Sequence, residues 1–383
     1  MTDGMTLAKI SYILKNNHTQ ASPALRLKGS PMHIPDGYLS PSTCALAYAV
    51  ALPFWLLAYQ RAKRLLHTRL VPLFAVFSAF CFVIMMFNLP LPGGTSGHAV
   101  GMAIASIVLG PWASIIAVSL ALLIQALFFG DGGISSFGAN SLNMAVVGSL
   151  VAWAVYHLLS AGADISSRRR VVAAGVAGYL AINASALLAA IEFGVQPLLF
   201  HDASGTPLYA PYPLAVAVPA MMIGHLSFAG LAEMLLSAGL VAYLQRAHPE
   251  LLTGAAGMTS QAVGRSRSVR QLWYGLAGLM ILSPLGLLAA GTAWGEWAAE
   301  DFANPASRQQ IIQASGLHAP PQAAPEGLAR LAGLWSAPFP DYAPAFIHSA
   351  GFGYVLSALF GAGLILLSLL LLSQLAGQRG QPQ

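Results

Sequence analysis

The sequence predicts an all-α polytopic membrane protein, with about seven transmembrane helices followed by two more near the C-terminus. Of its 383 residues, 56% are hydrophobic and only 8% are charged, and the mean hydropathy is +0.67. Soluble globular proteins carry about 25% charged residues, so the surrounding medium is expected to be a lipid bilayer. The net charge of +5 does not indicate nucleic-acid binding, because the basic residues lie mostly in short segments between apolar stretches.

Apolar stretches able to cross a bilayer, wholly or in part, follow one another along the chain. They are 43–60, 71–89, 98–110, 111–129, 142–160, 171–194, 213–244, 272–291 and 349–373. A full span needs about 20 residues, so the short stretch 98–110 is expected to form a helix pair with its successor across a tight turn at Gly110. The stretch 213–244 is too long for one straight span, and Pro219 and Gly224 are expected to kink it.

The distribution of arginine and lysine predicts the orientation in the inner (cell) membrane. Basic residues crowd the segments 61–69, 168–170 and 246–270, which should therefore be cytoplasmic. The segments 91–97, 130–141, 195–212 and 292–348 carry few basic residues and should be external. This alternation places Met32 outside and the C-terminus inside.

The same reading divides the chain into four parts. Residues 1–31 are an N-terminal extension, 32–244 a first membrane domain, 245–271 a cytoplasmic linker rich in Gly, Ser and Arg, and 272–383 a two-span part with the external loop 292–348. Residues 1–31 do not resemble a signal peptide, because Lys9 interrupts their apolar segment. They are either a disordered extension or the product of a start codon placed too far upstream, with Met32 as the true first residue.

The stretch Met32–Ser40 reads Met-His-Ile-Pro-Asp-Gly-Tyr-Leu-Ser and has no obvious use in a membrane helix. If Met32 begins the mature chain, its free amine, the amide nitrogen of His33 and His33 Nδ1 can wrap one metal ion in two fused chelate rings. A planar set of nitrogen ligands points to Ni(II) or Cu(II), and imidazole also suits Co and Zn. These three ligands leave a fourth position open.

The Pro/Gly-rich external segment that ends at His98 is the first candidate source of the fourth ligand. It delivers a histidine to the mouth of a helix on the same side of the membrane as Met32, so His33 and His98 could meet. Thr95 or Ser96 is expected to cap that helix and to support the site. The alternative is that His98 is an ordinary interfacial histidine.

A second external segment, 131–143, is polar and rich in glycine. It could wrap the N-terminal stretch and supply the hydrogen bonds that orient metal-ligating histidines, with Asn140 and Asn143 as the favoured residues. The alternative is a plain surface turn.

Polar residues inside the membrane are costly and often functional, and His225, Glu233 and Glu192 are candidates for a low-ranked polar path. His225 and Glu233 are spaced to share a helix face. They either form a second metal or proton path or, as we favour, pack between helices or against a partner subunit. The chain has no G-x-x-x-x-G-K-[ST] motif, so no ATP site of that type is expected.

The stretch Met32–Ser40 and the later Pro-Gly-Gly-Thr-Ser-Gly-His at 92–98 together resemble the CbiM/NikM family, the substrate-capture components of energy-coupling-factor (ECF) cobalt and nickel transporters. The resemblance extends to about Leu244. It implies that Met32, His33 and His98 hold Co²⁺ or Ni²⁺ as the transported substrate. It also implies a transmembrane coupling protein and two separate P-loop ATPase subunits as partners.

The C-terminal part is similar to the small two-span CbiN/NikN component of PDGLE type, although Ser-Pro-Leu-Gly-Leu at 283–287 replaces the Pro-Asp-Gly-Leu-Glu signature. The whole chain is thus expected to be a metal-capture subunit with no enzymatic activity of its own. Small residues at 173–178 are expected to pack against a partner helix. Two alternatives stay open, namely a stand-alone secondary transporter that relays protons through the polar path, and a membrane metal sensor or scaffold.

Overall fold

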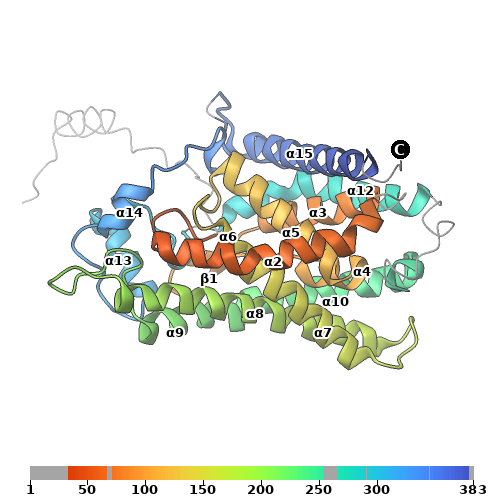
Figure 1. Ribbon diagram of the computed structural model, residues 1–383, viewed down its shortest axis with the longest axis horizontal. Coiled ribbons are helices and arrows are strands. Elements are labelled where there is room, and N and C mark those ends of the chain that lie inside the picture. The colour runs from red at the N-terminus through yellow and green to blue at the C-terminus, as the bar shows by residue number, and fades with distance from the viewer. Residues whose placement is uncertain (1–32, 67–70, 254–265, 290, 345, 379–383) are drawn as a thin grey trace, which may run out of the picture.

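The computed structural model describes residues 33–66, 71–253, 266–289, 291–344 and 346–378. The expected extension 1–31 and the proposed ligand Met32 therefore lie outside the described residues. Within them, the first part of the chain is a bundle of helices that run side by side (Figure 1). In chain order these are α2 (Pro41–Leu66), α3 (Val71–Met85), α4 (Met102–Leu109), α5 (Pro111–Ile124), α6 (Phe137–Asn140), α7 (Ser149–Ser160), α8 (Arg168–Leu199), α9 (Leu214–Gly224) and α10 (Gly230–Ala247).

Seven helices of the described chain are long and apolar enough to cross a membrane, which confirms the all-α polytopic class. Two expected stretches are shorter than a full span, because α3 has 15 residues and α4 only 8. An eight-residue helix is about 12 Å long, so α4 lies buried within the bundle rather than across it. The expected turn is present at Gly110, whose φ of 84° ends α4, and Pro111 then begins α5.

Three segments of π-helix interrupt the long helices in the part of the chain that the structure describes. They are η1 (Gln125–Phe129) at the end of α5, η2 (Ser141–Gly148) between α6 and α7, and η3 (His225–Ala229) between α9 and α10. Gly224 directly precedes η3, so the irregularity expected in the stretch 213–244 takes this form. Short π-helical segments inside α-helices are frequent at functional sites.

The small residues at the start of α8 pack inside the chain, so the expectation that they face a partner was wrong. A Cβ on Gly178 would lie 2.7 Å from Ser237 Oγ and 2.9 Å from the Glu233 carbonyl oxygen, both on α10. Gly175 likewise faces Met234 of α10. The glycines thus allow α8 and α10 to approach closely.

The C-terminal part adds two long helices, and both pack against α3 (Figure 1). Its elements are α12 (Ser266–Leu282), η5 (Ser283–Leu288), η6 (Ala299–Phe302), α13 (Pro305–Ala314), α14 (Glu326–Leu331), η7 (Pro340–Tyr342) and α15 (Ala350–Gln378). The loop expected at 292–348 holds the short helices η6, α13, α14 and η7. Helix α12 begins at Ser266, so the expected linker 245–271 is helical at its end.

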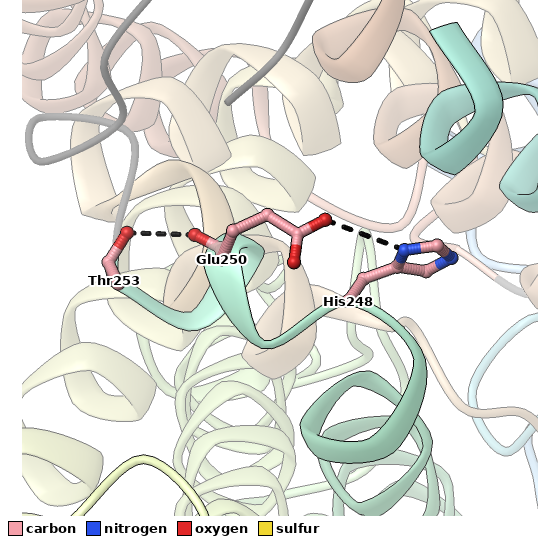
Figure 2. Close-up of polar contacts among 3 residues, drawn as sticks. All are labelled: His248, Glu250 and Thr253. Carbon is pink, nitrogen blue, oxygen red and sulfur yellow. Dashed lines mark hydrogen bonds and ion pairs between the residues drawn. The ribbon is translucent and has the colours of Figure 1, made fainter. Parts of the chain in front are cut away.

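The two ends of the bundle differ in structure. One end carries α13, α14 and a hairpin of β1 (Leu89–Leu91) and β2 (Thr95–Gly97), while α15 terminates at the opposite end (Figure 1). At the end of α10, the 3₁₀ turn η4 (Pro249–Thr253) closes this first part (Figure 2). There His248 Nδ1 lies 3.5 Å from Glu250 Oε1, and the Thr253 hydroxyl donates to the Glu250 carbonyl oxygen at 2.8 Å.

Candidate metal centre

The segment that begins at His33 is buried and is held by the polar segment 131–143. The amide of Ile34 donates to Asn140 Oδ1, and Asn140 Nδ2 donates back to the Ile34 carbonyl oxygen, each at 3.0 Å. The amide of Gly133 donates to the same carbonyl at 2.9 Å. The segment 131–143 therefore wraps the N-terminal stretch, and Asn140 fixes the residue next to His33.

Two glycines make this close approach possible. A Cβ on Gly133 would lie 2.3 Å from the Asp36 amide nitrogen, and one on Gly132 would lie 3.0 Å from His33 Cβ. Gly132 also has a φ of +89°, which side chains other than glycine rarely adopt. The glycine-rich composition of this segment thus has a direct cause, since any side chain here would displace the N-terminal stretch.

Three further anchors hold the stretch after Ile34. The Asp36 carboxylate accepts from the amide of Ser135 at 2.7 Å and from that of Ile134 at 3.2 Å. The Tyr38 hydroxyl donates to the Trp297 carbonyl oxygen at 2.7 Å, and the Ser40 amide donates to Gln196 Oε1 at 3.0 Å. The Pro-Asp-Gly turn and the residues after it are therefore held by hydrogen bonds from both the first part and the C-terminal part of the chain.

The structure brings His33 and His98 together. Their ring centroids lie 5.1 Å apart at an interplanar angle of 85°, and the two residues are only 2% and 7% exposed. His33 Nε2 lies 3.2 Å from Gln125 Oε1. Because that oxygen only accepts, Nε2 carries the proton. His33 Nδ1, the atom expected to bind metal, is then left with its lone pair, and it is buried with no hydrogen-bond partner.

His98 has the complementary tautomer. Its Nδ1 lies 3.0 Å from the Ala99 carbonyl oxygen, so Nδ1 carries the proton and Nε2 keeps its lone pair. Burial, and secondly the neighbouring His33, lower the pKa of His98 to about 4. The ring is therefore neutral at physiological pH, which is the form that binds metal.

Glu233 holds the backbone that follows His98. Its Oε2 accepts from the amides of Val100 at 2.8 Å and Gly101 at 3.0 Å, at the start of α4. A carboxylate is favourable at that position because the amide groups at a helix N-terminus are unpaired and carry partial positive charge. Of the two expectations for His225 and Glu233, these contacts fit the favoured one, packing between helices. The Glu233 carboxylate is used by this loop, and His225 Nδ1 contacts the Met221 carbonyl oxygen at 2.9 Å.

The expected capping role of Thr95 and Ser96 was also wrong. Both lie in β2, and α4 begins later, with Gly101 as its N-cap and no side-chain cap. Thr95 Oγ1 donates to the Pro92 carbonyl oxygen at 3.3 Å, and Ser96 Oγ donates to that of Gly291 at 2.8 Å. These residues support the site through the hairpin that carries His98.

A cavity of about 90 Å³ adjoins the two histidines. Asn143 and His225, which belong to the π-helical segments η2 and η3, line it. Asn143 Nδ2 donates to Glu192 Oε2 at 2.7 Å, so Glu192 lies behind the cavity wall rather than in it. Of the three residues of the expected polar path, only His225 thus reaches this space.

The C-terminal part supplies cavity residues that sequence reasoning missed. Trp294 and Glu296 line the cavity, and Glu296 is only 7% exposed with Oε2 unpartnered. Burial, and secondly Asp131, raise the pKa of Glu296 well above its usual range. The sequence offered one signal, a glutamate flanked by tryptophans in the loop 292–348, but nothing that placed it near His33.

The donor chemistry of this site depends on backbone atoms. Among the residues that the structure describes, no group of three or more His, Cys, Asp or Glu side chains is placed to hold a metal ion. Two imidazoles, each with one nitrogen that keeps its lone pair, do line the same cavity. Further ligands would have to come from nitrogen atoms at the start of the segment, next to His33.

Comparison with known proteins places the chain in a family. Residues 33–251 match CbiM, described as the cobalt uptake substrate-specific transmembrane region. The chain belongs to the CbiM family. Residues 270–377 of this CbiM-family chain match a second family, the PDGLE domain, so the predicted fusion of the two is confirmed.

Two of the similar proteins are named as fused transport proteins, and a solved structure matches the first part of the chain. The chain is 60% identical over 334 residues to the fused nickel transport protein NikMN of Rhodobacter capsulatus, covering 87% of this chain and 95% of that protein. It is 41% identical to the probable fused nickel transport protein LarMN of Lactiplantibacillus plantarum, covering 88% and 96%. A crystal structure of a truncated transition metal transporter is 50% identical, with a TM-score of 0.52, and covers 56% of this CbiM-family chain and 98% of its own.

Proposed function

We propose that this chain is the metal-capture subunit of an ECF-type transporter that imports Ni²⁺ or Co²⁺. The observation that carries the proposal is the pairing of two buried imidazoles whose hydrogen bonds leave His33 Nδ1 and His98 Nε2 without protons. Buried polar atoms normally have a partner. A metal ion is the partner that an unprotonated imidazole nitrogen beside a second one would accept.

The remaining ligands of the proposed site are the amide nitrogen of His33 and the amine of Met32. An amine, an amide nitrogen and Nδ1 of one histidine can close two fused rings, and His98 would then complete a set of four nitrogens. A planar arrangement of this kind favours Ni²⁺ among divalent ions, while imidazole ligation also suits Co²⁺. Relatives named as nickel and cobalt transport proteins support both ions.

The proposed orientation puts Met32 and the metal site outside the inner membrane and the C-terminus in the cytoplasm. The clusters of basic residues at 168–170 and 246–270 support it, because such clusters remain on the cytoplasmic side. Import then needs an energy source, which the resemblance to ECF components assigns to a transmembrane coupling protein and two P-loop ATPase subunits.

Uptake of radioactive nickel and cobalt by cells without their own importers tests this proposal. We expect accumulation when the chain is expressed together with its coupling protein and ATPases, and none when the P-loop lysine of the ATPases is replaced. Uptake by the chain alone in ATP-depleted cells would instead indicate a secondary transporter. Metal binding without uptake in every combination would indicate a sensor or scaffold, and either result would contradict the proposal.

A further inference from the structure

Four polar side chains form one continuous hydrogen-bonded series that ends on His33. The Tyr342 hydroxyl donates to Asp131 Oδ2 at 2.6 Å, and Gln125 Nε2 donates to the Tyr342 hydroxyl oxygen at 2.9 Å. Gln125 Oε1 then faces His33 Nε2 at 3.2 Å. Asp131, Gln125 and His33 belong to the first part of the chain, whereas Tyr342 comes from η7 in the C-terminal part.

The Asp131 carboxylate, at the end of the series opposite to His33, determines the direction of every hydrogen bond in it. A carboxylate oxygen accepts, so the proton of the Tyr342 hydroxyl is committed to Asp131. The phenol oxygen can then only accept from Gln125, which requires the amide NH₂ group on that side. The carbonyl oxygen of Gln125 consequently points to His33, and His33 must donate from Nε2. Burial, and secondly Asp131, raise the pKa of Tyr342 well above its usual range, so the phenol keeps its proton.

The backbone and packing around Tyr342 hold it in this place. Its ring stacks on Phe129 of η1, with centroids 4.7 Å apart and an interplanar angle of 19°. Its carbonyl oxygen accepts from the Ser357 hydroxyl on α15 at 3.0 Å. Asp341 and Tyr342 both have positive φ, at 55° and 58°. Bulky residues adopt that conformation only where the surrounding structure imposes it, and such places cluster at functional sites.

The C-terminal part also contacts the backbone that carries Gln125. The amide of Phe339 donates to the Phe128 carbonyl oxygen at 2.9 Å, and Trp335 Nε1 donates to that of Leu127 at 2.9 Å. A π-helical end leaves such carbonyls without helical partners. The segment 335–342 therefore holds the backbone of η1 in place, and it also determines which way the Gln125 amide group points.

We propose that Tyr342 is a positioning residue through which the C-terminal part sets the tautomer of His33 and so prepares Nδ1 to bind the transported metal ion. Without the phenol oxygen, the Gln125 amide has no acceptor for its NH₂ group and is free to turn over. Its NH₂ group would then face His33 Nε2, and the imidazole proton would move to Nδ1, where it blocks metal ligation. The effect on metal rests on the proposed function, whereas the effect on the tautomer does not.

Tyr342→Phe removes one oxygen atom and tests this idea. The matched control is Tyr354→Phe, because the Tyr354 ring lies 5.4 Å from that of Tyr342 but is not part of the series. In full-length, metal-free protein labelled with ¹⁵N-histidine, we expect only the Nε2–H form of His33 in the unchanged protein and the control. We expect both tautomers in Tyr342→Phe, with His33→Gln used to assign the signals. A pure Nε2–H form in Tyr342→Phe would overturn the inference.

Metal titration of the same variants, made in the chain that begins at Met32, gives a second readout. Changes to residues that orient a ligating histidine typically cost about 10–100-fold in metal affinity, and we expect Tyr342→Phe to lose Ni²⁺ affinity within that range while Tyr354→Phe does not. Gln125→Leu should lose a similar amount, and the double variant should lose no more than either single one, because both act through one path. Additive losses would show that Tyr342 does not act through Gln125.

The two readouts separate the inference from the proposed function. If the unchanged protein binds neither Ni²⁺ nor Co²⁺ but Tyr342→Phe still shifts the tautomer, the proposed function fails and the positioning role of Tyr342 stands. If the unchanged protein binds metal tightly and Tyr342→Phe changes neither tautomer nor affinity, the proposed function stands and the positioning role fails.

Discussion

Replacement of His98 by alanine is expected to lower the affinity for Ni²⁺ or Co²⁺ by well over tenfold and to abolish uptake at low metal concentration. His98 would supply a nitrogen bound directly to the ion, and the loss of such a ligand costs more than the roughly 10–100-fold typical of residues that only orient ligands. Asn140→Ala, which removes hydrogen bonds to the residue after His33, is expected to fall within that smaller range.

Isothermal titration of the purified protein measures both effects. His201→Ala is a suitable control, because His201 is exposed and lies outside the cavity. Thermal unfolding of the metal-free variants shows whether each one is folded. A folded His98→Ala variant that binds and transports metal normally would remove His98 from the site and leave it an ordinary buried histidine.

The second large effect concerns the amine of Met32. A chain that begins at Met32 is expected to bind metal far more tightly than the 383-residue chain, because only a free α-amine can act as a ligand. The loss of this ligand should again exceed the range of about 10–100-fold seen for residues that orient ligands.

Two controls isolate the amine from the rest of residues 1–31. One alanine placed before Met32, or acetylation of Met32, should reduce affinity to the level of the long chain while leaving the fold unchanged. Equal affinity in all these forms would exclude the amine as a ligand. His33 and His98 would then be completed by other groups, and Glu296 is a carboxylate that lines the same cavity.

The membrane class and most helix positions could be read from the sequence, because apolar length and arginine clusters report directly on the bilayer. What could not be read was how tertiary packing reshapes those stretches. The stretch 98–110 is mostly apolar, yet Gly101 and Gly110 limit α4 to eight residues. The π-helical segments have no sequence signal of their own, and they determine where Gln125, Asn143 and His225 lie.

The sequence predicted only those residues of the candidate site whose role can be inferred from their immediate neighbours in the chain. His33 stands out because a histidine directly after a methionine can chelate, and His98 because glycines deliver it to the same side. Thr95 and Ser96 were wrongly expected to cap a helix. Ser or Thr before an apolar stretch is typical of a helix N-cap, and the sequence carries no separate signal for the short hairpin that they form. Tyr342 and Glu296 were missed because they are hundreds of residues distant along the chain. Only the fold brings Glu296 to the cavity wall and Tyr342 to Gln125, which contacts His33.

The number of protons released on metal binding shows whether the N-terminal amine and amide bind the ion. His98 is already neutral above its lowered pKa of about 4, so it releases none between pH 6 and 8. The His33 amide must lose its proton to bind, and the Met32 amine, with a reference pKa of about 7.7–8.0, is mostly protonated at pH 7. Deprotonation of both ligands makes affinity rise with pH.

Calorimetry in buffers of different ionisation enthalpy counts these protons for the chain that begins at Met32. We expect more than one proton to be released per metal ion near pH 7, with affinity increasing from about pH 6 to 8 as the amine deprotonates. A count near zero with an affinity that does not change over this range would contradict the N-terminal chelate.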